Sequence, residues 1–316
     1  MRKLAENPEA TVFVAGGAGM VGGALVRHLK QRLPIKVEAP SSQRLNLKQR
    51  REVFDFVATV KPDYVVMAAA KVGGIIANST LPYDFISTNL QIQTNLLDAC
   101  LEHRVPRVLF LGSSCIYPRD AQQPISEDSL LSGPLEETNK PYALAKLAGI
   151  VQVQSARVQY GLDWISAQPT NLYGIGDNYH STHSHVIPGL IRRYHEAKLT
   201  KADAVMNWGT GTPTRDFLFS EDVAEALHFL LDEYHSDVPI NIGSGSEISI
   251  RNVASLISEV VGFSGTTNWD AAKPDGTPRK VLDSSLLNNL GWAPRTSLVE
   301  GLQLAYRDFL SRDTRK

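Results

Sequence analysis

The chain has 316 residues, of which 43% are apolar, and a formal net charge of −1 at pH 7. This composition is typical of a folded globular protein, and it excludes the strongly basic surface that captures nucleic acids or anionic membranes. Charged residues and a proline precede the first apolar run, no apolar block is long enough to span a bilayer, and two cysteines cannot form a disulfide framework. We therefore expect a cytoplasmic protein whose ligands are small molecules, with no metal site.

Short apolar runs alternate with helical patterns through the first half of the chain. The runs predicted as strands are residues 11–16, 35–40, 63–70, 107–114 and 163–170. The helical segments are 21–32, 47–60, 84–103 and 142–160, which carry apolar residues three and four positions apart. Because parallel strands need crossover helices, this order predicts an α/β fold around a parallel sheet.

A glycine-rich loop joins the first predicted strand to the first helix, in FVAGGAGMVGGALV (13–26). Small residues there let a pyrophosphate approach the backbone N–H groups of the helix N-terminus. The loop reads both as glycines at 16, 19 and 22 and as G-x-G-x-x-G from Gly17, so spacing alone does not choose between dinucleotide-binding variants. The strand before it and the apolar helix after it favour cofactor binding over a plain turn. The loop residues assigned to the cofactor are Gly16, Gly17, Ala18, Gly19, Met20, Val21 and Gly22.

The end of the second predicted strand bears on the choice between NAD and NADP. An acidic residue there would bind the ribose hydroxyls of NAD, whereas this sequence places Ser41, Ser42 and Arg44 at the strand end and Glu38 inside the strand. Hydroxyls and a guanidinium favour the 2′-phosphate of NADP. The alternative is that Arg44 is an ordinary solvated residue.

One tyrosine and one lysine follow the fourth predicted strand by a single crossover connection. Tyr142 and Lys146 lie four residues apart on one helix face, where a phenol can protonate a carbonyl that accepts a hydride and an ammonium can favour the phenolate. Tyr194 and Lys198 repeat the spacing, so position must decide between the pairs. Only the first pair follows a strand that ends in serines, and Ser113 is expected to hydrogen-bond the same carbonyl.

After about residue 172 the regular alternation ends. A loop rich in Gly, Asn and His is followed by predicted helices at 186–198 and after Ser220, a plausible N-cap, and by a strand at 238–244. We expect residues 1–172, with a returning segment at about 214–244, to form the nucleotide-binding domain. Residues 173–213 and 245–316 are expected to form a smaller, interleaved C-terminal α/β substrate domain.

Separated motifs resemble the extended short-chain dehydrogenase/reductase superfamily, notably GGAGMVGG, SSCIY and YALAK. Six segments are similar to the GDP-L-fucose synthases in particular: AAAKVGGI (68–75), LGSSCIYP (111–118), PTNLYG (169–174), HVIPGLIRR (185–193), WGTGTPTRDF (208–217) and KPDGTPRK (273–280). The resemblance implies a Rossmann-type doubly wound sheet, NADP(H) and a homodimer paired through the helices after the third and fourth strands. That family epimerises a GDP-4-keto-6-deoxy-mannose at C3 and C5 and then reduces C4 with NADPH. Ala18 departs from relatives that carry a basic residue in the glycine loop, while other relatives use a serine pair.

Epimerisation beside a ketone requires a base on one face of the sugar and an acid on the other, and a thiol and an imidazole both exchange protons near neutral pH. The resemblance implies Cys115 as the base and His185 as the acid. Most free cysteines are small core residues, as Cys100 is expected to be, but Cys115 lies in a polar loop behind two serines. Only the similarity of SHVIP (184–188) to the family favours His185 over the nearby His180 and His183.

The resemblance also implies further contacts. For the cofactor these are Ser41, Ser42, Arg44, Leu47, Ala69, Leu111, Gly112, Ser114, Lys146, Pro169, Thr170, Asn171, Leu172 and His185. For the GDP-sugar they are Arg193, Trp208, Arg215, Asp275 and Lys280. Asn178 either touches substrate or caps a turn.

Four other functions remain open from the sequence. They are a related GDP-sugar 5-epimerase/4-reductase of the GDP-L-colitose or GDP-heptose type, a redox-neutral 4-epimerase, a thiol hydrolase and a non-catalytic NADP-binding sensor. The second has no use for Cys115 and His185, the third leaves the glycine loop unexplained, and the fourth does not account for an intact Ser113, Tyr142 and Lys146.

Overall fold

The centre of the molecule is a six-stranded, fully parallel sheet with the strand order β10-β5-β4-β3-β1-β2. The computed structural model describes residues 3–181, 183–273 and 275–312, so Pro274, within one quoted motif, and the last four residues of the predicted second domain lie outside the described residues. The strands are β1 (Thr11–Ala15), β2 (Lys36–Glu38), β3 (Tyr64–Met67), β4 (Arg107–Leu111), β5 (Asp163–Pro169) and β10 (Ile240–Ile242). The α/β, Rossmann-type fold class predicted from the sequence is confirmed.

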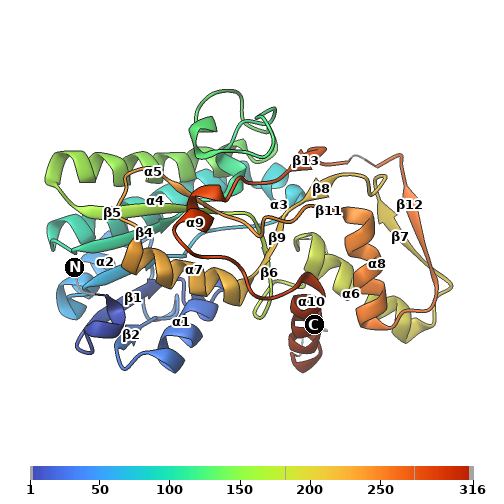
Figure 1. Ribbon diagram of the computed structural model, residues 1–316, viewed down its shortest axis with the longest axis horizontal. Coiled ribbons are helices and arrows are strands. Elements are labelled where there is room, and N and C mark those ends of the chain that lie inside the picture. The colour runs from blue at the N-terminus through green and yellow to red at the C-terminus, as the bar shows by residue number, and fades with distance from the viewer. Residues whose placement is uncertain (1–2, 182, 274, 313–316) are drawn as a thin grey trace.

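Helices cover both faces of this sheet (Figure 1). One face packs on α1 (Met20–Arg32) and α7 (Ser220–Glu233), whose apolar residues form a single cluster with β1, β4, β5 and β10. The other face packs on α2 (Arg50–Val60), α4 (Pro82–Glu102) and α5 (Lys140–Tyr160). Burial of apolar strands from both sides is what the near-continuous apolar runs of the sequence require.

Several predicted boundaries are wrong: the strands predicted at 63–70, 107–114 and 238–244 are Tyr64–Met67, Arg107–Leu111 and Ile240–Ile242. Strand β2 ends at Glu38 rather than at residue 40, because Pro40 offers no N–H to a neighbouring strand and restricts Ala39 before it. Ser220 is the first residue of α7 rather than its N-cap, which is Phe219, and its hydroxyl donates to the Glu221 carboxylate.

A second group of elements lies beyond the carboxyl ends of the strands, on the right of Figure 1. It contains α6 (Val186–Thr200), α8 (Ile250–Val261) and α10 (Leu298–Ser311), which share one apolar cluster. Strands β7 (Ala204–Trp208) and β12 (Thr266–Asp270) pair in parallel, and β11 (Ile248–Ser249), β8 (Thr214–Arg215) and β13 (Arg279–Lys280) form a small mixed sheet. We propose that these elements are the substrate domain, within the interleaved boundaries expected from the sequence.

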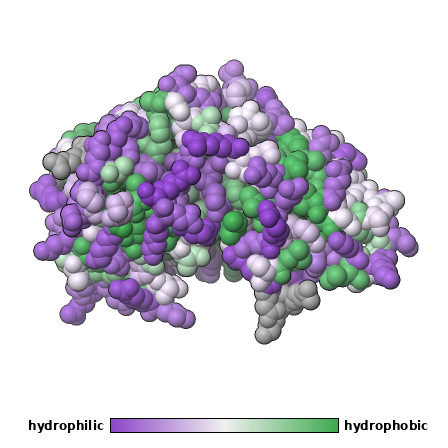
Figure 2. Space-filling model, turned by 60° about the horizontal axis from the view of Figure 1, so that its bottom comes forward, coloured by the Kyte–Doolittle hydropathy of each residue, from purple (hydrophilic) through white to green (hydrophobic). Residues whose placement is uncertain are grey.

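Short elements connect the two groups. Strand β6 (Asn171–Tyr173) pairs with β9 (Phe217–Phe219), where the chain crosses between them. The remaining elements are η1 (Leu4–Glu6), α3 (Ile75–Thr80), η2 (Ser114–Ile116), η3 (Glu127–Ser129) and α9 (Ser285–Asn289). Within the described ranges, no helix is both long and apolar enough to cross a membrane. Figure 2 shows one face of the molecule, where hydrophobic residues form separate patches among hydrophilic ones.

Candidate active site

The glycine loop between β1 and α1 is packed so closely that a side chain on Gly16, Gly17 or Gly22 would clash with neighbouring atoms. Gly16 has φ +89°, and a Cβ on it would lie 2.6 Å from the Ala69 backbone nitrogen. A Cβ on Gly22 would lie 2.3 Å from the Gly16 carbonyl oxygen. Helix α1 begins at Met20 with Gly19 as its N-cap and has no acidic residue in its first turn. The backbone N–H groups of the loop and helix therefore form a cradle that suits an anion.

The predicted NADP-selecting residues lie beyond β2 rather than at its end. Ser41, Ser42 and Arg44 are exposed in a turn in which the Arg44 N–H donates to the Ser41 carbonyl over 3.0 Å. Glu38 is the last residue of the strand, and its carboxylate lies 3.3 Å from the Lys36 ammonium. The side-chain carboxylate at this strand end is thus paired with a lysine of the same strand.

The other predicted cofactor residues gather at the carboxyl ends of neighbouring strands. Ala69 follows β3, Leu111 ends β4 with Gly112 after it, and Pro169 ends β5. Thr170 and Asn171 both donate side-chain hydrogen bonds to the Asp216 carbonyl, over 3.1 Å and 2.9 Å. Leu172 lies in β6, Ser114 is buried in η2, and Leu47 packs at the apolar cluster under α2 and α4.

Ser113, Tyr142 and Lys146 meet at the end of β4. The Lys146 ammonium donates to the Leu111 carbonyl over 2.7 Å, and burial lowers its pKa to about 8. Burial raises the pKa of the Tyr142 phenol, the charge of Cys115 raises it further, and a hydrogen bond with Ser113 acts in the opposite direction. Burial is the largest influence on the pKa of Tyr142, because a charged phenolate would lose its hydration there. A protonated Tyr142 is the form that can donate a proton.

Cys115 lies in η2, one turn beyond Ser113, and its sulfur contacts a lysine from a distant strand. The Lys280 ammonium donates to Sγ over 3.2 Å, and the Cys115 N–H donates to the Ser113 hydroxyl over 3.2 Å. Burial raises the pKa of the thiol, but the charge of Lys280 and hydrogen bonds from Ser113 and Lys280 outweigh it and lower the pKa overall. Cys100 is fully buried on α4, and burial raises its pKa, as a core cysteine requires.

His185 is the N-cap of α6 and is exposed to solvent on one side. The pKa of its imidazole is lowered, first by loss of hydration against the protein and then by the charge of Lys280. Its loop is docked on the segment after β3, since the Gly74 N–H donates to the His183 carbonyl over 3.4 Å. Lys280 therefore contacts one predicted proton carrier, Cys115, and its charge also acts on the other, His185.

The predicted substrate residues line the elements beyond the sheet. Arg193 on α6 donates to Asn207 over 2.7 Å, next to Trp208, which is 55% exposed on β7. Asp275 accepts hydrogen bonds from the Thr210 N–H and hydroxyl over 2.9 Å and 2.7 Å. Arg215 in β8 is influenced by the charges of both Cys115 and Asp275. These residues lie on α6, β7, β8 and β13, and Asp275 lies between β12 and β13.

The alternative residues have structural partners. Tyr194 is fully buried and hydrogen-bonds Thr267, while Lys198 donates to the Val261 carbonyl. His180 and His183 stack on each other with ring centroids 4.7 Å apart. The Asn178 carboxamide accepts the His180 N–H, so it caps a turn.

Two residues of the site carried no signal in the sequence. Gln168 of β5 accepts the Ser113 N–H over 3.1 Å, which fixes the backbone of the catalytic loop. The charge of Glu136 acts to raise the pKa of Cys115. Its carboxylate accepts hydrogen bonds from Thr138 and Asn139 ahead of α5. Both act through contacts between segments, which no local motif encodes.

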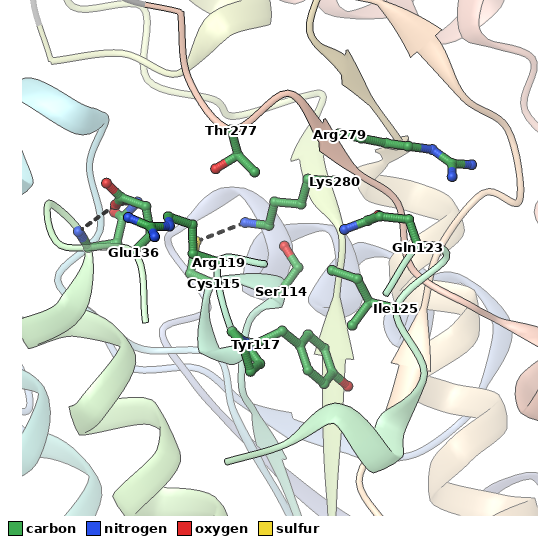
Figure 3. Close-up of a pocket in the computed structure, with 12 residues that line it drawn as sticks. Ser114, Cys115, Tyr117, Arg119, Gln123, Ile125, Glu136, Thr277, Arg279 and Lys280 are labelled. Atoms are coloured by element: carbon green, nitrogen blue, oxygen red, sulfur yellow. Dashed lines mark hydrogen bonds between the residues drawn. The ribbon is translucent and has the colours of Figure 1, made fainter. Parts of the chain in front are cut away.

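A small pocket of about 40 Å³ opens beside the sulfur (Figure 3). Cys115, Glu136, Arg119, Arg279 and Lys280 line it, together with Ser114, Tyr117, Pro118, Gln123, Ile125, Asn139 and Thr277. It has room for a few water molecules. The thiol therefore has a polar side, and one further side packs on the cluster of Ala77, Phe85 and Tyr142.

Comparison with known proteins agrees with this geometry. The model of the NAD dependent epimerase/dehydratase family matches residues 12–243. The chain is 55% identical to probable GDP-L-fucose synthase 1 of Oryza sativa subsp. japonica, over 94% of this chain and 90% of the relative. It is 48% identical to GDP-L-fucose synthase of Escherichia coli (strain K12), over 96% of this chain and 98% of the relative. A GDP-L-fucose synthetase of Naegleria fowleri bound to NADP has a TM-score of 0.89 at 27% identity, over 96% of this chain and 93% of that chain.

Proposed function

Because the chain belongs to the NAD-dependent epimerase/dehydratase family and, within it, to the GDP-L-fucose synthases, we propose that it makes GDP-L-fucose. It inverts C3 and C5 of GDP-4-keto-6-deoxy-D-mannose and then reduces C4. The observation that carries this proposal is the contact of Cys115 with Lys280 beside Ser113 and Tyr142, at the same sheet edge as the glycine cradle.

The residues present fit NADP(H). The loop Gly16–Gly22 lies at the N-terminus of α1, which has no acidic residue in its first turn, and the close packing of its glycines fixes the loop backbone. These glycines would hold the pyrophosphate, Ser41, Ser42 and Arg44 the 2′-phosphate, and the residues after β3, β4 and β5 the nicotinamide half. NADPH, when bound there, supplies the hydride for the reduction at C4. Lys146, whose ammonium is fixed on the end of β4, would bind the nicotinamide ribose.

For the reduction, Tyr142 donates its phenolic proton to the C4 oxygen. Ser113 hydrogen-bonds the same oxygen and so orients the ketone. The raised pKa of Tyr142 keeps the proton on the phenol until negative charge develops on the substrate oxygen. The same two donors stabilise the enolate during epimerisation, as an oxyanion hole does.

For the epimerisation, Cys115 removes a proton from the carbon next to the ketone, and His185 delivers one from the opposite face. A thiolate is the basic form, and the lowered pKa of Cys115 supports this role. The open position of His185 at the N-terminus of α6 leaves its ring accessible to a sugar. Each inversion moves one proton onto sulfur and one from the imidazole, so solvent must restore both groups between steps.

The GDP half would lie against α6, β7 and β8, beyond the carboxyl ends of the central strands. Arg193 and Arg215 suit the pyrophosphate, because guanidinium groups bind phosphate oxygens in pairs. The exposed indole of Trp208 offers a face to the guanine, and Asp275 and Lys280 complete the set implied by the resemblance.

We also propose a cytoplasmic homodimer. Cys100 and Cys115 are both free thiols, which suits a reducing compartment. Leu144, Val151 and Val158 of α5 are 42%, 47% and 84% exposed and recur every seven residues along one face. An apolar stripe of this kind, on a helix that packs with α4, supports pairing with a second copy through these helices.

The function is tested by incubating GDP-4-keto-6-deoxy-mannose with the protein in D₂O, with and without NADPH, and locating deuterium by NMR. Label at both C3 and C5, with one NADPH oxidised per product, is the expected result. Label at C5 alone identifies the colitose or heptose type of enzyme. NADP binding with neither exchange nor reduction identifies the sensor, and both outcomes contradict the proposal.

A further inference from the structure

Among the residues that the structure describes, the side-chain partner of the Lys280 ammonium is the sulfur of Cys115. Its ammonium donates to Cys115 Sγ over 3.2 Å. No carboxylate of the described residues forms an ion pair with it. Its neighbour Arg279 lines the same pocket but pairs with Glu247 over 2.7 Å. In Figure 3, Lys280 extends toward Cys115 while Arg279 points away from it.

The backbone around Lys280 is fixed from two sides. Strand β13 pairs with β8, with Lys280 opposite Arg215, and the Asp216 N–H donates to the Lys280 carbonyl over 3.4 Å. The next residue, Val281, donates its N–H to Gln123 over 3.0 Å and accepts the Ile125 N–H over 2.8 Å. Lys280 is therefore held between the small mixed sheet and the loop that continues from Cys115, unlike a mobile surface lysine.

Several charged groups face the sulfur, and they do not act in the same direction. Glu136, ahead of α5, opposes a thiolate, whereas Lys280 on β13 favours it and Ser113 hydrogen-bonds it. Arg215 on β8 interacts with the same charge, and Tyr142 on α5 is disfavoured as an anion by it. Since burial alone would keep the thiol protonated, the contact with Lys280 is the decisive favourable interaction.

We propose that Lys280 is a positioning residue for the epimerisation: its ammonium holds Cys115 as an oriented thiolate, instead of serving mainly as a ligand for the substrate pyrophosphate. This inference rests on the proposed function for its purpose, but the contact itself exists in the protein without substrate. Burial lowers the pKa of His185 and the charge of Lys280 lowers it further, so the same cation acts on both partners.

The test measures alkylation of Cys115 by iodoacetamide against pH, without substrate, with the modified peptide quantified by mass spectrometry. Cys100 is fully buried and serves as an internal reference. Lys280→Met should raise the alkylation midpoint by about 1–2 pH units and slow alkylation at pH 7 about tenfold. Lys280→Arg should keep the midpoint near the wild-type value, because it keeps the charge. Arg119→Met, which removes another pocket cation that is paired with Asp120, should leave the midpoint unchanged.

A wild-type midpoint in Lys280→Met would overturn the proposal, and a raised KM for the GDP-sugar as its sole defect would assign Lys280 to substrate binding. If Lys280→Met does not fold, Lys280→Gln is compared in the same way. With substrate, both limbs of the pH profile of deuterium exchange should move to higher pH in the folded variant, since both Cys115 and His185 lose the influence of the cation. Absence of any exchange by wild-type protein would contradict the proposed function and leave the alkylation result standing.

Discussion

The Lys146 ammonium lies 2.7 Å from the carbonyl oxygen of Leu111, the last residue of β4. The same ammonium lies 4.8 Å from the centre of the Phe110 ring, so it is anchored at the strand end rather than on Tyr142. Helix α5 is thereby tied to the sheet edge where Ser113 follows. The same hydrogen bond keeps Tyr142, one turn earlier on that helix, near the carboxyl end of β4.

Tyr142→Phe should slow reduction at C4 by a factor of about 10²–10⁴, because it removes the proton donor and leaves the cofactor cradle intact. Stopped-flow loss of NADPH fluorescence measures the rate, and titration measures cofactor affinity. Phe85 packs edge-on against the Tyr142 ring, so the aromatic contact survives the change. An undiminished reduction rate would remove Tyr142 from the mechanism.

Gly22→Ala should weaken NADP binding at least tenfold and destabilise the fold. The added Cβ would lie 2.3 Å from the Gly16 carbonyl oxygen, and backbone must move to admit it. Gly23→Ala is the matched control, since its Cβ would meet no atom closer than 3.4 Å. Isothermal titration with NADP and thermal unfolding compare the two. Equal affinities would show that the tight loop is not the cofactor cradle.

Acid should destabilise the protein through His28. Its Nε2 lies 3.0 Å from His228 Nδ1 between α1 and α7, and burial lowers its pKa to about 4, with the charges of His228 and Arg32 adding to the effect. Unfolded histidine titrates near 6.5, so the unfolded chain binds more protons as pH falls from 6.5 to 4, and the free energy of unfolding decreases across that window. Allowing for partial exposure, the loss is about 1–2 kcal/mol.

Urea unfolding at pH 7 and pH 5 measures that dependence. His28→Asn should flatten it, whereas the exposed His103→Asn should not. Identical pH slopes for the wild type and His28→Asn would assign the acid sensitivity elsewhere.

Val151→Lys should convert the proposed dimer to a monomer, because it places a charge in the middle of the apolar stripe on α5. Sedimentation velocity at equal protein concentration measures the change. Val299→Lys on α10, at 43% exposure close to that of Val151, is the control and should remain dimeric. A dimeric Val151→Lys would place the contact on another surface.

Much of the fold follows from local patterns. The apolar runs and the glycine loop predicted the parallel sheet and its first crossover because these signals lie within one strand or one helix. The pair Tyr142 and Lys146 could be chosen over Tyr194 and Lys198 because only the first follows a strand that ends in serines.

The rest depends on contacts between distant segments. Cys115 and Lys280 are separated by 165 positions, so no spacing rule brings them together. Gln168 supports Ser113 from the neighbouring strand, and β2 ends before Pro40 although the apolar pattern continues to it. The raised pKa of Tyr142 likewise depends on burial, which tertiary packing sets.

The claim on which the mechanism depends is that the Cys115 sulfur carries protons between the sugar and solvent. The most direct measurement is deuterium exchange into GDP-4-keto-6-deoxy-mannose by Cys115→Ser, compared with the wild type at equal NADP saturation. Exchange at C3 and C5 should fall at least about 100-fold while NADP affinity stays unchanged. Full exchange by the serine variant would contradict the account.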